Sequence, residues 1–120
     1  MELKANELRI GNLVEINAPI TNKIISIDVY HISGLKKNKG YFKPIPLTEE
    51  WLFKFGFFTI KAGKLIDATL PNFRFSLHKS GNYDGFLFCE KNNIIINIDY
   101  VHQLQNLYFA LTNKELEIKM

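Results

Sequence analysis

Residues 99–113, DYVHQLQNLYFALTN, carry the clearest folding signal in this chain, because their apolar side chains recur at helical spacing. At about 100° per residue, these side chains fall within an arc of roughly 120°, as expected for a helix packed on a core. Asp99 is the expected N-cap, and Asn113 tolerates the left-handed backbone that ends many helices. The apolar stripe consists of Val101, Leu104, Leu107, Tyr108 and Leu111.

The opposite face of this predicted helix lacks charge, which is unusual for a surface in contact with water. No Lys, Arg, Asp or Glu occurs from Tyr100 to Asn113. Interface centres lose charged residues and gain aromatic ones, so binding of another protein or of a second copy is one explanation. The other is that the protein's own sheet or C-terminal tail covers this face. The candidate partner-binding residues are His102, Gln105, Asn106 and Phe109.

Composition fits one folded domain over residues 1–120. Apolar residues make up 47% of the chain, which excludes a disordered protein. No apolar run approaches about 18 residues, so we expect no membrane span, and the N-terminus lacks the apolar stretch of a secretory signal. The single Cys89 cannot form an internal disulfide. Together these features predict a cytoplasmic protein.

Alternating apolar and polar residues predict several short strands. Residues 8–16 and 23–32 alternate in the first third of the chain, and residues 57–99 have the turn spacing of an antiparallel meander. Residues 114–119 could add a closing edge strand. The predicted fold class is α+β, with an antiparallel β-sheet or a small, partly open barrel and one short and one longer helix packed on it.

The short helix is predicted from residues 48–56, TEEWLFKFG. Thr48 is a favourable N-cap, two acidic residues follow in the first turn, and Gly56 ends the segment. A helix of about two turns is unstable alone, so its large apolar residues should anchor it to the sheet. These residues are Trp51, Leu52 and Phe55.

A lysine-rich loop is the second candidate site. The chain has a formal net charge of +3, and its lysines gather in residues 36–64. Lysines contact phosphates and aromatic rings can stack on bases, so this loop could bind nucleic acid without sequence preference. The open alternative is a solvated basic loop without a ligand. The candidate residues are Lys36, Lys37, Lys39, Tyr41, Phe42 and Lys43.

Catalytic and metal patterns are weak. Cys89 with His78 or His102 and Asp99 has the composition of a nucleophile, a base and an orienting group. Cys89 lies in an apolar strand, however, where a buried and unreactive thiol is expected. The three histidines lack the spacing of metal ligands. We therefore predict no enzyme activity, no metal site and no cofactor.

PIPLTEEWLFKFGF and YVHQLQNLYFALTNKELEI, within residues 44–58 and 99–118, resemble a family of short, uncharacterised proteins encoded by phages and prophages of gut bacteria. This resemblance implies a phage-associated, cytoplasmic context, and it carries no activity and no site residue. The predicted function is protein interaction, with a phage or host protein or with itself, through the uncharged face of helix 100–111. The alternative is sequence-independent nucleic-acid binding through the basic loop 36–43.

Overall fold

The structure is a computed structural model, and it describes residues 8–16, 23–27, 42–62, 65–70, 76–79, 86–90 and 93–119. The chain divides into two compact units. Unit 1 comprises residues 1–45 and 100–115, and unit 2 comprises residues 46–99 and 116–120. The prediction of one domain over residues 1–120 stays a prediction beside this division.

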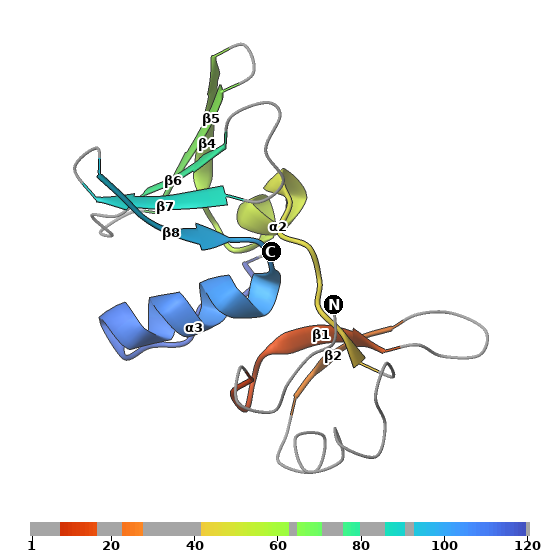
Figure 1. The fold of residues 1–120 in the computed structure, drawn as a ribbon. Helices are drawn as coiled ribbons and strands as arrows, with labels where there is room; N and C mark the ends of the chain where they lie inside the picture. Colours follow the sequence, from red (N-terminus) through yellow and green to blue (C-terminus); the bar gives the residue numbers. More distant parts are fainter. Residues whose placement is uncertain are drawn as a thin grey trace. The chain divides into compact units, whose positions relative to one another are not determined.

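Unit 1 contains a small antiparallel sheet and the longer helix (Figure 1). The strand order is β2-β1-β3. Val14 and Ile27 are fully buried, and they form a core with Leu8 and the half-buried Ile16 and Ile25. The elements of this unit are β1 (Leu13–Ile16), β2 (Lys23–Ser26), β3 (Phe42–Lys43) and α3 (Val101–Thr112).

The ends of α3 follow local backbone chemistry. Its N-cap is Tyr100, one residue later than the predicted Asp99, and the Tyr100 N–H donates to Gln103 Oε1 at 3.1 Å. Gln103 thus provides the side-chain half of a capping box. Asn113 ends the helix with a φ of 59°, which confirms the predicted left-handed exit.

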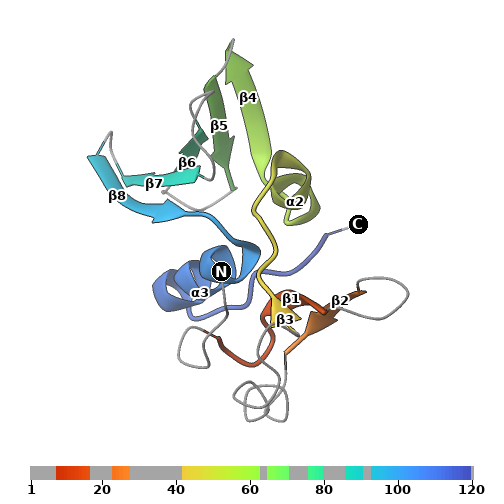
Figure 2. The ribbon, with the colours of Figure 1, turned by 45° about the vertical axis from the view of Figure 1, so that its right-hand side comes forward.

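Unit 2 contains a five-stranded antiparallel meander with the short helix beside its first strand (Figure 2). Each strand pairs with its sequence neighbours, so β4 and β8 are the two edges among the described strands. Phe86, Phe88 and Ile98 belong to the buried core of this unit. The elements are α2 (Glu49–Lys54), β4 (Phe58–Ala62), β5 (Leu65–Thr69), β6 (Ser76–Lys79), β7 (Phe86–Glu90) and β8 (Asn93–Ile98).

The predicted short helix is confirmed. The Thr48 hydroxyl accepts a hydrogen bond from the Trp51 N–H at 3.4 Å, and Gly56 leaves the helix with a φ of 88°. Trp51, Leu52 and Phe55 are buried, so the helix is held by its apolar side chains as expected for so short a segment.

The α+β class is confirmed, with two antiparallel sheets, and neither sheet closes into a barrel among the described strands. The predicted edge strand at residues 114–119 is wrong. Leu116 is buried in unit 2, and the Lys119 N–H donates to the Lys54 carbonyl at 2.6 Å. The C-terminal residues therefore reach the end of α2 without adding a strand to either sheet.

Candidate functional site

The uncharged face of α3 is largely buried or half-buried. His102 and Gln105 are buried, while Asn106 and Phe109 are half-buried. The residues that contact Gln105, Asn106 and Phe109 come from the N-terminal segment 9–13, which approaches the helix before and at the start of β1. These four predicted partner-binding residues therefore do not form an open face.

Gln105 holds the bend at the start of β1. Its side-chain oxygen accepts from the Leu13 N–H at 2.8 Å, and its side-chain nitrogen donates to the Gly11 carbonyl at 3.3 Å. Gly11 has a φ of 98°, a backbone conformation that residues other than glycine rarely adopt. The buried side-chain amide of Gln105 thus provides hydrogen-bond partners for two backbone groups of the turn, the Leu13 N–H and the Gly11 carbonyl.

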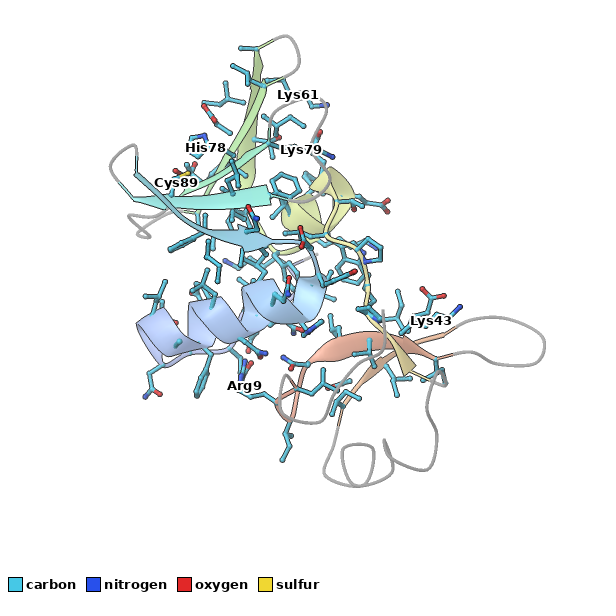
Figure 3. All side chains as sticks on the ribbon, viewed as in Figure 1. Arg9, Lys43, Lys61, His78, Lys79 and Cys89 are labelled. Atoms are coloured by element: carbon cyan, nitrogen blue, oxygen red, sulfur yellow. The ribbon has the colours of Figure 1, made fainter. Side chains whose placement is uncertain are left out.

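Arg9 covers the remaining part of the face (Figure 3). Its guanidinium carbon lies 4.2 Å from the centre of the Phe109 ring, and its Nε donates to Asn106 Oδ1 at 3.0 Å. The same Asn106 oxygen accepts from Asn12 Nδ2 at 2.8 Å, and the Arg9 guanidinium also pairs with Glu115. Partner binding at this face stays a prediction, and it would require these contacts to break.

The basic loop is described at its C-terminal end alone. Lys36, Lys37, Lys39 and Tyr41 lie outside the described residues. Phe42 and Lys43 form β3, where Lys43 is exposed and its Cα lies opposite Glu15 of β1. An acidic residue therefore faces the last lysine of the predicted phosphate-binding group.

A polar cluster joins β5 and β6 in unit 2. The Ser76 hydroxyl and His78 Nε2 are 2.8 Å apart, and His78 Nδ1 contacts Asp67 Oδ1. Ser76 and His78 are two residues apart on one strand, so they share a face, and the register sets Asp67 directly opposite His78. Figure 3 shows His78 and Cys89 on this sheet.

The order of these groups is that of a serine nucleophile, a base and an orienting carboxylate. Ser76 lies in a central strand, paired opposite Thr69 of β5 and Cys89 of β7. Backbone N–H groups in such a strand serve the two ladders, so they are unavailable to stabilise an oxyanion. We therefore interpret the cluster as a cross-strand polar link.

Cys89 with His78 or His102 and Asp99 was the weak catalytic pattern of the sequence, and the structure gives His78 a different carboxylate partner. His78 pairs with Asp67, while His102 belongs to unit 1 and Asp99 to unit 2. Burial, with a smaller contribution from Asp67, raises the pKa of the Cys89 thiol, which disfavours the reactive thiolate. Among the described residues, no three His, Cys, Asp or Glu side chains form a group that could hold a metal ion.

All five residues of β4 are exposed. Phe58 and Ile60 have exposed fractions of 65% and 70%, and they lie on one face of the strand. Leu65 of β5, also exposed, lies opposite Ala62 and extends this apolar surface. We call Phe58, Ile60, Ala62 and Leu65 the β4 apolar edge.

The other face of β4 is directed toward α2. Phe57, just before the strand, is buried, and Lys61 Nζ lies 2.8 Å from Glu49 Oε2 at the start of α2. Lys61, the charged residue of β4, is thus partnered on the helix side. The opposite face of the strand carries apolar side chains. The backbone edge of β4 beside them pairs with no other described strand.

Sequence reasoning missed this edge. The alternation of residues 58–62 predicts a strand but does not tell which strand ends a sheet, because that depends on the pairing of distant segments. A usable signal was present in the position of β4 as the first strand of a run of consecutive hairpins, since the first and last strands of a meander are edges.

Comparison of the chain with protein-family models, curated proteins and solved structures gave no match. None of the described helices is long and apolar enough to cross a membrane.

Proposed function

We propose that this protein is a protein-interaction module that binds an extended segment of its partner at β4. The observation that carries the proposal is the combination of an edge strand and exposed apolar residues at one place. An edge strand presents backbone N–H and C=O groups that a second strand can pair with, and its alternate side chains select the sequence of that strand.

The chemistry of β4 favours this use. Proteins usually protect an edge strand with charges, proline or a covering segment. Here the strand carries one charge, Lys61, which already pairs with Glu49, and the apolar side chains of Phe58 and Ile60 stand exposed beside it. Burying both side chains would supply about 1.5–3 kcal/mol each by area, before the cost of ordering the partner.

The proposed module is non-catalytic and cytoplasmic, and it acts in a phage or prophage context. The resemblance of residues 44–58 and 99–118 to phage-encoded proteins supports that context. The contacts of Arg9 and Gln105 support the choice of β4 over the α3 face, because they occupy the side chains that a partner of α3 would need.

The test is binding of a labelled synthetic peptide of residues 57–62, FFTIKA, followed by fluorescence anisotropy. We expect saturable binding of the peptide to the chain. The Ile60→Lys substitution in the chain should weaken this binding at least about tenfold, equivalent to about 1.4 kcal/mol. Ile96→Lys, at an exposed isoleucine of the other edge strand, is the matched control and should bind like the parent. Equal binding of a peptide with Ile60 and Lys61 exchanged would refute strand addition, because the exchange destroys the alternation.

A further inference from the structure

We infer that the strand that docks on β4 is the β4 strand of a second copy of this chain, antiparallel and centred on Ile60. The inference rests on the proposed function, since it names the partner of the same edge. It would join two five-stranded sheets into one continuous sheet across a two-fold axis.

The sequence of β4 is compatible with itself in this register. Centred on Ile60, the pairing sets Ile60 against Ile60 of the other copy and Phe58 against Ala62, so apolar side chains meet on one face. On the other face, Thr59 lies opposite Lys61, and no two like charges are directly opposed. All five residues of the strand therefore find a compatible partner.

The neighbouring registers fit less well. A shift by one residue of one strand would set side chains of opposite faces against each other. Centring on Lys61 would oppose two lysines, which is destabilising. Centring on Thr59 would leave Ala62 unpaired and place Lys61 against Phe57, which is already buried in its own unit. The register centred on Ile60 is thus the one that pairs apolar residues with apolar residues and keeps the two lysines apart.

Charge and local pairing also favour β4 over β8. Each Lys61 keeps its own Glu49 at 2.8 Å, so the two copies bring neutralised lysines to the seam. Immediately after β8, the Asp99 carbonyl accepts from the Leu47 N–H at 2.9 Å, so the chain itself occupies that end of the edge. Among the described residues, strand pairing of β4 is with β5.

The first test is sedimentation velocity of the full chain between about 5 and 500 µM, a range that reveals dimers of micromolar affinity. We expect a concentration-dependent dimer, a dissociation constant raised at least tenfold by Ile60→Lys, and no change with Ile96→Lys. A monomer over the whole range, or a dimer indifferent to Ile60→Lys, would overturn the inference. Circular dichroism should show that both variants fold, since both positions are exposed.

The second test reads the register of the dimer. In a Cys89→Ser background, Ile60→Cys should oxidise to a disulfide-linked dimer, because directly opposed residues lie within disulfide reach. Thr59→Cys and Lys61→Cys should not, because each is offset from its own copy by two residues. Efficient linkage through either of these controls would refute the register.

The two proposals fail differently. A chain that stays monomeric yet binds the 57–62 peptide at β4 would refute the homodimer and leave strand addition in place. A chain that binds neither the peptide nor a second copy through β4 would refute both.

Discussion

The Gln105 side chain makes hydrogen bonds to the backbone at Gly11 and Leu13 while being buried. These bonds give one residue of the uncharged helix face a partner within the chain. Amide groups can serve the backbone of a bend without the cost of burying an ionised group. At Gln105, an uncharged side chain therefore serves an internal contact.

Gln105→Leu should destabilise unit 1, because the Leu13 N–H and the Gly11 carbonyl would lose their side-chain partner. The expected loss is about 1–3 kcal/mol, the usual cost of a buried group left unsatisfied. Urea denaturation would measure it, and hydrogen exchange at residues 11–13 would locate it. Leu111→Gln is the matched control at an exposed position of the same helix, and it should change stability by less than about 0.5 kcal/mol. Equal effects of both variants would contradict this account.

Cys89 should react slowly with thiol reagents in the folded protein. Burial, followed by the Asp67 charge, raises the pKa of this thiol above its ordinary value, so less thiolate forms at neutral pH. Alkylation by iodoacetamide should be many-fold slower than in urea and should increase as the pH rises through 9.

The same pKa shift has a stability consequence. Because the folded protein holds the Cys89 proton more tightly than the unfolded chain, the associated stability is fully present below the ordinary thiol pKa. It is lost as the pH rises through the higher pKa of the folded state. Cys89→Ser should lack this alkaline decline, and an unchanged pH profile in that variant would show that the thiol is not its source.

At the level of elements, local signals were sufficient for the helices. The Thr48 cap and Gly56 defined α2, and Asn113 defined the end of α3. The predicted N-cap of α3 was displaced by one residue, because Gln103 reaches back to the Tyr100 N–H and fixes the first turn there. Such a choice between two adjacent caps depends on a side-chain conformation that residue type alone does not settle.

The positions of the strands in the sequence were predictable, whereas the contacts between side chains of different segments were not. The alternation of residues 57–99 indicated a meander, and β4 to β8 confirm it. The link between Asp67 and His78, however, depends on a register between strands, and the contact between Arg9 and Phe109 joins residues far apart in the chain. No local sequence pattern encodes either contact. The sequence therefore could not show that the α3 face is largely buried, and the candidate site proposed from the structure is β4 instead.

Nucleic-acid binding by the basic loop 36–43 is a separate prediction, and its dependence on salt concentration can test it. If Lys36, Lys37 and Lys39 bind phosphates, labelled single-stranded DNA should bind at about 50 mM salt and lose affinity by orders of magnitude at about 200 mM. Replacing the three lysines by Gln should weaken binding and reduce its salt slope. An unchanged slope in the triple variant would exclude the loop, and no binding at low salt would leave it a solvated segment.

The whole molecule combines a closed surface with an open one. In unit 1, the polar face of α3 is occupied by Arg9, Asn12 and Leu13. In unit 2, the β4 apolar edge is exposed, and among the described strands β4 pairs on one side alone, with β5. We therefore propose that partner binding belongs to unit 2.

Nuclear magnetic resonance mapping of the amides of the ¹⁵N-labelled chain during titration with the 57–62 peptide tests this assignment most directly. We expect chemical-shift changes to concentrate in β4 and its neighbour β5, while the amides of residues 101–112 stay unchanged. Shifts concentrated at His102, Gln105, Asn106 and Phe109, with β4 unaffected, would contradict it and return the binding surface to α3.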